Sequence, residues 1–142
     1  MHKPDLPSRR ALMRALYAAD MADETPSRDH VYQVRQSLDD HGPVEWTTIA
    51  ASADEIGARL PDIDAHINDL PTNWRLERMA AVDRNLLRLG IFEILFEERP
   101  AIITIDALVE VAKEFGSDST SAFINGQLDQ LCQDHGIAIR RR

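Results

Sequence analysis

Residues 73–96 decide the fold, and they read Asn73-Trp-Arg-Leu-Glu-Arg-Met-Ala-Ala-Val-Asp-Arg-Asn-Leu-Leu-Arg-Leu-Gly-Ile-Phe-Glu-Ile-Leu-Phe96. Apolar residues recur in this stretch at helical spacing, with others beside them: Met79, Val82, Leu86, Leu87, Leu89, Gly90, Phe92 and Ile94. The resulting apolar surface is too wide to be covered by a single neighbour. We therefore predict a long central helix from about Trp74 to Glu97, ended by Arg99-Pro100, inside a helical domain.

Helical spacing also marks the segments on both sides of this stretch. Ser and Thr at a helix start accept backbone N–H bonds, whereas Pro and Gly interrupt helices, so both kinds of residue locate the boundaries. Before the central stretch, we predict a helix capped by Ser8, a second opened by Thr25-Pro26 and stopped at Gly42-Pro43, and a third from Trp46 to Pro61. The second helix has Val31, Val34 and Leu38 on one face, and a short fourth helix runs through Ile63, Ile67 and Leu70. After the central stretch, we predict a helix from Thr104 to a left-handed Gly116 and a last helix that is capped by the Ser117–Thr120 stretch, buries Phe123 and ends at Gly136.

Only Ala101-Ile-Ile103 has the composition of a strand, and it would have no strand to pair with. We interpret it as an extended connector. The predicted fold class is all-α, and the length of 142 residues indicates one domain.

The net charge of −8 argues against a general nucleic-acid binder, because such proteins usually carry a basic field that displaces counterions from phosphates. The charge is unevenly distributed, however. Acidic residues dominate positions 20–72, whereas arginines cluster at Arg9, Arg10 and Arg14 and again at Arg140–Arg142.

Membrane and secretory features are not apparent in the sequence. No apolar run is long enough to cross a bilayer, and the N-terminus lacks the apolar core of a signal peptide. Cys132 is the single cysteine, so no intrachain disulfide is expected, and Leu128 and Leu131 nearby suggest a buried thiol. We expect a cytoplasmic protein without a membrane partner.

Catalytic and metal-binding motifs are weak. The histidines lack the spacing of helical metal sites, and Asp62 with His66 is better explained as a solvated ion pair. Glu93 and Glu97 lie one turn apart, but the Glu-x-x-His partner of a carboxylate metal site is missing, which favours a polar rim. We predict no catalytic residues, no metal and no cofactor, and hence a protein that is not an enzyme.

The arginines of the first helix are more informative. Arg10 and Arg14 share a face, with Arg9 beside them, near a helix start where positive charge is unfavourable. They either present guanidinium groups to an anionic partner or form an ordinary solvated face. Tyr17 follows on the same helix and either stacks on an unpaired base or lies half-buried in the core.

Several blocks of the chain resemble the NusB family of bacterial transcription antitermination factors. The central stretch resembles the family's core helix, and Ser8–Tyr17 resembles its first helix. Ala112-Lys-Glu-Phe-Gly116, then Phe123-Ile-Asn-Gly126 with Leu128-Asp129, resemble two further blocks in the same order. The resemblance implies one NusB-like domain of two packed three-helix subdomains, about residues 8–60 and 61–136, followed by a basic tail, 137–142.

The resemblance also implies a function. NusB proteins bind boxA-type single-stranded RNA together with a NusE-type ribosomal protein, act on the transcription elongation complex and support ribosomal RNA synthesis. Some members form homodimers. Carried over residue by residue, the likeness places Arg9, Tyr17 and Phe123 near RNA, with Arg10 and Arg14 beside them. It places Asp83 and the adjacent Arg84 at the partner interface.

One block departs from the family pattern. The loop before Phe123 usually supplies an aspartate and a lysine, and here Ser119 and Ala122 stand in their places. This difference supports an alternative, a NusB-fold paralogue that has lost RNA recognition and acts as a protein-interaction module or homodimer.

Arg9 is expected to be exposed on the first helix. We therefore predict that Arg9→Ala weakens RNA binding and leaves the melting temperature nearly unchanged.

Overall fold

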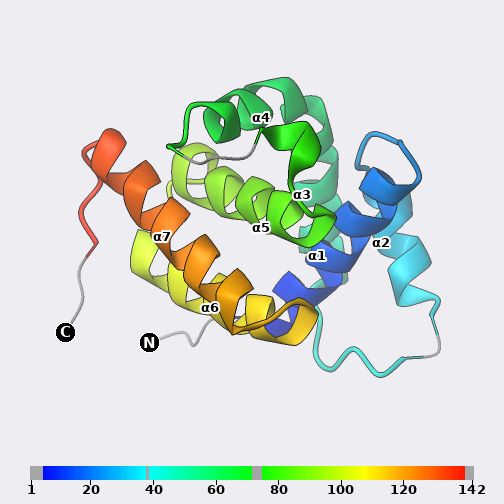
Figure 1. The fold of residues 1–142 in the computed structure, drawn as a ribbon. Helices are drawn as coiled ribbons and strands as arrows, with labels where there is room; N and C mark the ends of the chain where they lie inside the picture. The colour runs from blue at the N-terminus through cyan, green and yellow to red at the C-terminus, as the bar shows by residue number, and fades with distance from the viewer. Residues whose placement is uncertain (1–4, 38, 72–74, 140–142) are drawn as a thin grey trace. The chain divides into compact units, whose positions relative to one another are not determined.

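The computed structural model describes residues 5–37, 39–71 and 75–139, and every regular element in these ranges is helical (Figure 1). The absence of strands from the described residues confirms the all-α prediction. The chain divides into two compact units, Met1–Leu60 and Pro61–Arg142. None of the helices in the described ranges is long and apolar enough to cross a membrane. The predicted roles of Leu38, of Trp74 and of Arg140–Arg142 fall outside the described residues.

The first unit contains α1 (Leu6–Met21), α2 (Arg28–Arg35) and α3 (Trp46–Ala58), and each of these helices packs against the other two. The predicted inner faces of α1 and α3 are confirmed by the burial of Leu12, Ala15, Leu16 and Ala19 on α1 and of Ile49, Ala50, Ala53 and Ile56 on α3. On α2, Val31 is buried as predicted, whereas Val34 is only half-buried. Small residues on α1 and α3 let the helices approach closely, and burial of their apolar faces stabilises the unit.

Gly57 marks a close approach between α3 and the segment before α2. A Cβ atom at this position would lie 2.0 Å from the Pro26 carbonyl oxygen. Because that oxygen belongs to the backbone, it cannot move aside as a flexible side chain would. Position 57 therefore accepts only glycine in this packing.

Two helix starts differ from the predictions. Asp5, not Ser8, caps α1, because its carboxylate accepts the Ser8 backbone N–H at 3.0 Å. The Ser8 hydroxyl instead accepts the backbone N–H of Glu45 at 2.9 Å and so links the start of α1 to the start of α3. Similarly, Ser27, not Thr25, caps α2, and His30 completes a capping box there.

Two predicted boundaries in this part of the chain are also wrong. α2 ends at Arg35, well before Gly42-Pro43, so the helix does not extend as far as predicted. Pro61 does not end α3, which stops at Ala58, but lies in the first turn of α4 (Leu60–Asn68). Proline fits a first turn because the N–H that it lacks has no partner there in any case.

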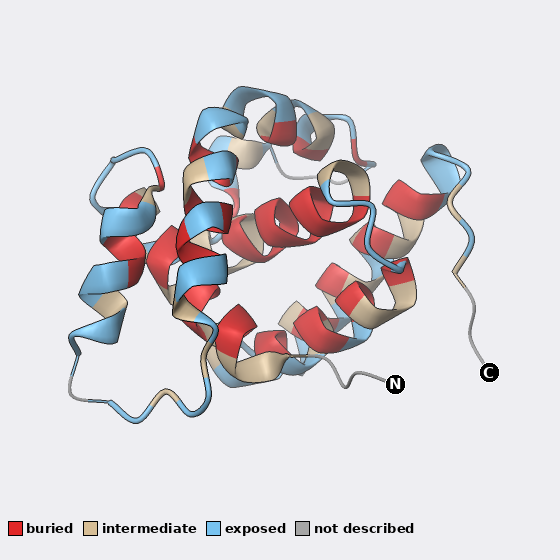
Figure 2. Cartoon of the chain, turned by 180° about the vertical axis from the view of Figure 1, so that it is seen from behind, coloured by how far each residue is buried: buried red, intermediate tan, exposed pale blue. Residues whose placement is uncertain are grey.

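The second unit is built around α5 (Ala81–Ile91), which packs against α6 (Ala101–Phe115) and α7 (Asp118–Asp134). Every residue of α5 from Asn85 to Ile91 is buried, as the red segment in Figure 2 shows. Ile63, Ile67 and Leu70 are buried as predicted, and so is the Cys132 thiol. The wide apolar surface that we read from the sequence is therefore the centre of this unit.

The central helix is shorter than predicted. Leu76–Arg78 forms a separate 3-10 turn, η1, and Met79 and Ala80 are extended, so α5 begins only at Ala81. The Arg84 guanidinium donates to the carbonyl oxygens of Leu76 and Met79, at 3.0 and 3.1 Å. These bonds satisfy backbone acceptors outside a helix, which explains why the segment need not be helical.

The end of the central segment is wound more loosely than an α-helix. Phe92–Phe96 forms a π-helical turn, η2, in which the Glu97 N–H donates to the Phe92 carbonyl at 2.9 Å. The prediction of a polar rim is wrong for Glu93, which is buried and accepts the Thr104 hydroxyl at 2.8 Å. Ala101–Ile103 is the first turn of α6 and not an extended connector.

The join between α6 and α7 is partly as predicted. Ser117 caps α7 by accepting the Thr120 N–H at 3.3 Å, which confirms the capping role of this stretch. Gly116 ends α6, but its φ of −133° is not left-handed. Phe123 on α7 is only half-buried, contrary to the prediction that this helix buries it.

Candidate nucleic-acid interface

The basic face of α1 consists of Arg10 and Arg14, and Tyr17 follows it by one turn. Both arginines are half-buried, and Tyr17 is 39% exposed, so its ring is accessible. The Arg14 NH1 group lies 3.5 Å from His41 Nδ1 and 3.9 Å from an Asp39 carboxylate oxygen. The three α1 residues thus form a surface of two guanidinium groups and an exposed aromatic ring.

Arg9 does not belong to this exposed surface. It is only 6% exposed, which contradicts the prediction that it projects away from the buried face. The sequence contains a signal for this burial, because Leu12, Met13 and Leu16 follow Arg9 at the i+3, i+4 and i+7 positions of one helix face. This burial argues against the prediction that Arg9→Ala leaves the melting temperature nearly unchanged.

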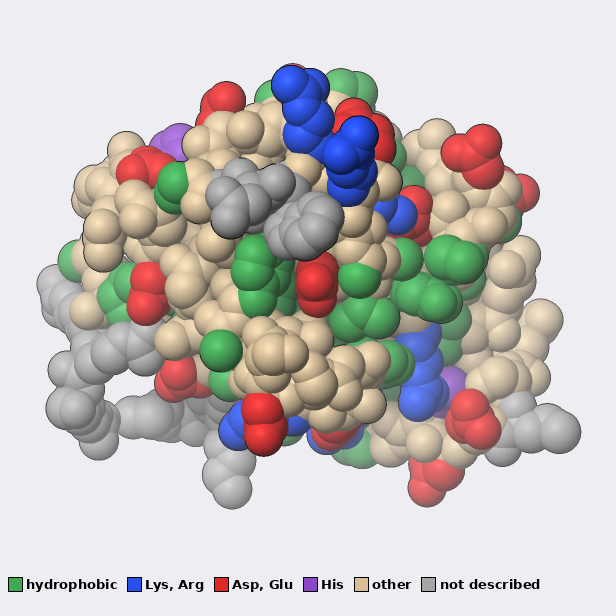
Figure 3. Space-filling model, in the orientation of Figure 1, with side chains coloured by type: hydrophobic (Ala, Val, Ile, Leu, Met, Phe, Trp, Pro, Cys, Tyr) green, Lys and Arg blue, Asp and Glu red, His purple; other side chains and the backbone are tan. Residues whose placement is uncertain are grey.

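The electrostatic character of the surface is mixed. On the face drawn in Figure 3, Lys and Arg side chains occur in small groups with Asp or Glu nearby. Asp39 is close to Arg14 and is itself largely exposed. The α1 surface therefore offers local cationic contacts and no broad basic field, in keeping with the net charge of −8.

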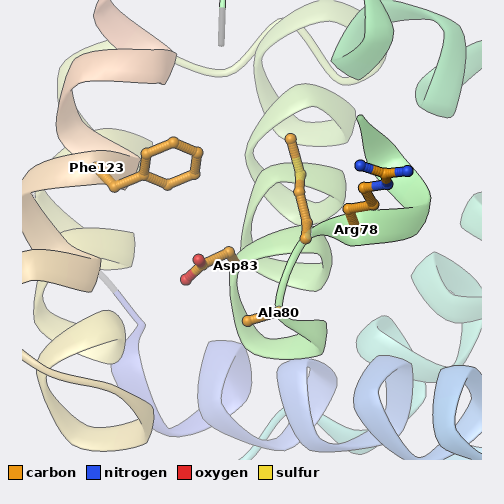
Figure 4. Close-up of a pocket in the computed structure, with 5 residues that line it drawn as sticks. Arg78, Ala80, Asp83 and Phe123 are labelled. Atoms are coloured by element: carbon orange, nitrogen blue, oxygen red, sulfur yellow. The ribbon is translucent and has the colours of Figure 1, made fainter. Parts of the chain in front are cut away.

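A shallow pocket of about 260 Å³ lies in the second unit, lined by Arg78, Met79, Ala80, Asp83 and Phe123. In Figure 4, the Phe123 ring extends from α7 across the pocket and the Asp83 carboxylate faces the α7 side. The Arg78 guanidinium points away from Phe123. The structure thus brings together Asp83, which the resemblance assigns to the protein partner, and Phe123, which it assigns to RNA.

Burial raises the pKa of the Asp83 carboxyl above its ordinary value of 3.8, because desolvation disfavours the charged form. A donor supplied by a binding partner would restore part of the lost solvation. The pocket is therefore suited to a group that combines an apolar surface, for Phe123 and Met79, with a cation or hydrogen-bond donor for Asp83.

Arg84 fixes part of the pocket wall, although it does not line the pocket itself. Its bond to the Met79 carbonyl, at 3.1 Å, fixes the extended backbone that carries two lining residues, Met79 and Ala80. Sequence reasoning missed the lining roles of Arg78, Met79 and Ala80, because it treated the whole segment as helix. The only available signal was their proximity in sequence to Asp83.

The loop that departs from the family pattern has a structural use. The Ser119 hydroxyl lies 2.8 Å from that of Ser117, the residue that caps α7, and both Ser119 and Ala122 are exposed.

Within the described residues, no group of three or more His, Cys, Asp or Glu side chains is placed to hold a metal ion. The predicted ion pair between Asp62 and His66 is not among the contacts of His66, whose ring packs edge-on against Phe96 and His135.

Comparison with known proteins places the chain in a family. A model of the NusB family matches residues 6–133. The transcription antitermination protein NusB of Sorangium cellulosum is 44% identical over 97 residues, which cover 65% of this chain and 69% of the relative. The corresponding protein of Lachnoclostridium phytofermentans is 32% identical over 124 residues, covering 87% of this chain and 94% of the relative.

Other matches are shorter or structural. Against the NusB protein of Anaeromyxobacter sp., 42% of 87 residues are identical, and the match spans 59% of that protein. A crystal structure of the antitermination factors NusB and NusE in complex with dsRNA has the same fold, with a TM-score of 0.81 at 21% identity over 94% of this chain and 99% of that one. Because the family match extends over most of the sequence, and the fold agrees, the chain belongs to the NusB family.

Proposed function

We propose that this protein is a non-catalytic transcription antitermination factor that binds boxA-type single-stranded RNA together with a NusE-type ribosomal protein. It acts on the transcription elongation complex in the cytoplasm and supports ribosomal RNA transcription. The observation that carries the proposal is the accessible Tyr17 one turn after Arg14 on the basic face of α1, in a chain of the NusB family.

The α1 surface has the chemistry to bind unpaired RNA. Arg10 and Arg14 contact phosphate oxygens, and the Tyr17 ring stacks on a splayed base. Base stacking on an aromatic ring contributes about 1–3 kcal/mol, and each neutralised phosphate makes affinity depend more steeply on salt. Arg9 has a positioning role, since its burial holds the start of α1 in place.

The pocket beside Asp83 is the proposed contact for the ribosomal protein. A basic or amide side chain of the partner pairs with the Asp83 carboxylate, and Phe123, which the resemblance assigns to RNA, lies beside it in the same pocket. The partner also supplies cations that the α1 surface has in small number. RNA affinity is therefore strongest for the pair of proteins, and a homodimer of this chain would compete with that pair.

Fluorescence anisotropy of labelled boxA RNA tests this function. The protein is titrated with and without the NusE-type partner, at two salt concentrations, against a scrambled RNA of equal length. We expect specific, salt-sensitive binding that strengthens with the partner and weakens in Arg10→Gln, Arg14→Gln and Tyr17→Leu. If neither the protein nor the pair prefers boxA, the chain is a NusB-fold protein-interaction module instead.

A further inference from the structure

A second group of side chains lies between α2 and α3, at positions to which the family resemblance assigns no role. The Arg35 guanidinium carbon lies 5.6 Å from the centroid of the Trp46 ring, as in a cation–π pair. The His41 ring meets the same indole edge-on, with centroids 5.3 Å apart. Arg35 ends α2 and Trp46 begins α3, so both side chains are held on helix ends.

Arg35 is available to a ligand in a way that its neighbour Arg28 is not. Arg28 forms an ion pair with Asp54 at 2.6 Å, and a second bond to Asp54 comes from the Arg28 backbone at 2.7 Å. Arg35 is exposed, and among the described residues no carboxylate lies within ion-pair distance of it. The Arg35 guanidinium lies over the face of the Trp46 indole. It is a cation in a region of the sequence where acidic residues predominate.

His41 connects this pair to the basic face of α1. Its Nε2 atom lies 2.9 Å from the Ser37 hydroxyl, and its Nδ1 atom lies 3.5 Å from the Arg14 NH1 group. The ring is therefore held between Arg14 on one side and Trp46 on the other. All of these residues belong to the first unit, so their proximity is a property of that unit alone.

We propose that Arg35 and Trp46 form an additional contact for single-stranded RNA, continuous with the α1 surface through His41 and Arg14. A base stacks on the layer formed by the guanidinium and the indole, and the adjacent phosphate pairs with Arg35. Both planar guanidinium groups and aromatic rings stack on unpaired bases. Asp39, whose carboxylate lies 3.9 Å from Arg14, disfavours further phosphates beside this contact.

This inference rests on the proposed RNA-binding function, and the first test measures RNA affinity at several salt concentrations. Arg35→Gln should weaken binding of boxA RNA several-fold and reduce the log–log salt slope by about 0.7, the value for one phosphate on a single strand. Trp46→Leu should weaken binding about tenfold through lost stacking and leave the slope unchanged.

Arg28→Gln is the matched control, because it removes the same charge from the same helix at a residue already paired with Asp54. Arg28→Gln also leaves the Asp54 carboxylate without its cation. Any loss of RNA affinity that comes only from the change in net charge is therefore fully present in this control. An affinity and slope for Arg35→Gln equal to those of Arg28→Gln would overturn the proposal. Thermal melts check that Trp46→Leu is folded, and Arg35→Gln carries the test if it is not.

A second readout reports stacking directly. Trp74→Phe leaves Trp46 as the only tryptophan, since the sequence contains two. Saturating boxA RNA should quench its fluorescence, whereas unchanged emission at saturation contradicts the proposal. If the wild-type protein shows no preference for boxA, the proposed function itself fails. If it binds and Arg10, Arg14 and Tyr17 variants weaken it, but Arg35 and Trp46 variants do not, only this inference fails.

Discussion

Arg88 in the second unit and several arginines of the first unit have different surroundings. In the second unit, Arg88 is 7% exposed, and its guanidinium donates to both carboxylate oxygens of Asp64 and to the Asn85 side chain. In the first unit, Arg10 and Arg14 are only half-buried, and Arg35 is exposed above an indole ring. Arg88 thus holds the scaffold of the second unit, whereas Arg10, Arg14 and Arg35 of the first unit are more accessible to a ligand.

This difference explains why a sequence block that resembles a family need not be the functional surface. The block at residues 73–96 contains Leu86, Arg88 and Gly90, all of them buried in the second unit. The residues with accessible chemistry in the first unit lie in the Ser8–Tyr17 block or, for Arg35 and Trp46, in a segment to which the resemblance assigns no role. Substitutions in the two units should therefore separate loss of stability from loss of binding.

Leu86→Ala should have the largest effect on stability. The Leu86 side chain is fully buried at 0% exposure, so its truncation leaves a cavity in the second unit. We expect a loss of about 2–5 kcal/mol in the free energy of unfolding, measured by urea denaturation. A loss below about 1 kcal/mol would mean that α5 is not the centre of its unit.

Arg88→Met tests the scaffold role of arginine in the second unit. Removal of the guanidinium leaves the Asp64 carboxylate, with 18% side-chain exposure, without the cation that it binds at 2.8 Å. We expect destabilisation of about 3 kcal/mol, because one partner of a largely buried pair is left charged. The double substitution Asp64→Leu with Arg88→Met should regain part of the loss. If the single variant is as stable as the wild type, the pair contributes nothing to the scaffold.

Arg9→Ala tests the exception in the first unit. Because Arg9 is buried and has a polar or electrostatic partner, we expect Arg9→Ala to lose about 1–3 kcal/mol of the free energy of unfolding in a chemical denaturation experiment. Arg10→Gln should cost less than Arg9→Ala, because Arg10 is only half-buried. Equal stability of the two variants would contradict the assignment of Arg9 to the buried side of α1.

Asp83→Asn should have the smallest effect on stability, and its effect should depend on pH. Since burial raises the pKa of Asp83 in the folded state, the folded protein binds the proton more tightly than the unfolded chain does. The wild type therefore loses stability as the pH rises from the ordinary value of 3.8 through the raised pKa. Asn lacks this loss, so the variant should gain stability relative to the wild type at pH 7 compared with pH 3. Parallel pH profiles of the two proteins would contradict the burial of this carboxyl.

Much of the fold is predictable from apolar spacing. The inner faces of α1 and α3, and the buried core of α5, follow from residues at helical intervals. Helix boundaries are not predictable in the same way, because they depend on competing partners for backbone groups. The start of α5 depends on Arg84, which binds the carbonyls of Leu76 and Met79 through the fold.

The candidate site is less predictable. Helical spacing correctly places Arg10, Arg14 and Tyr17 on α1, and the same spacing, applied to Leu12 and Leu16, indicates that Arg9 is buried. The pocket beside Asp83 joins Phe123 to a segment that precedes it by some forty residues, and the Arg35–Trp46 pair spans the α2–α3 connection. Single-sequence patterns contain no signal for such tertiary contacts.

The most direct test of the contrast between the units is an amide chemical-shift map of the ¹⁵N-labelled protein, titrated with boxA RNA. We predict large shifts along α1, from Arg10 to Tyr17, and in the Arg35–Trp46 segment. The buried amides of Asn85–Ile91 in α5 should remain nearly unchanged. Shifts confined to the second unit, with α1 unaffected at saturating RNA, would contradict the assignment of RNA binding to the first unit.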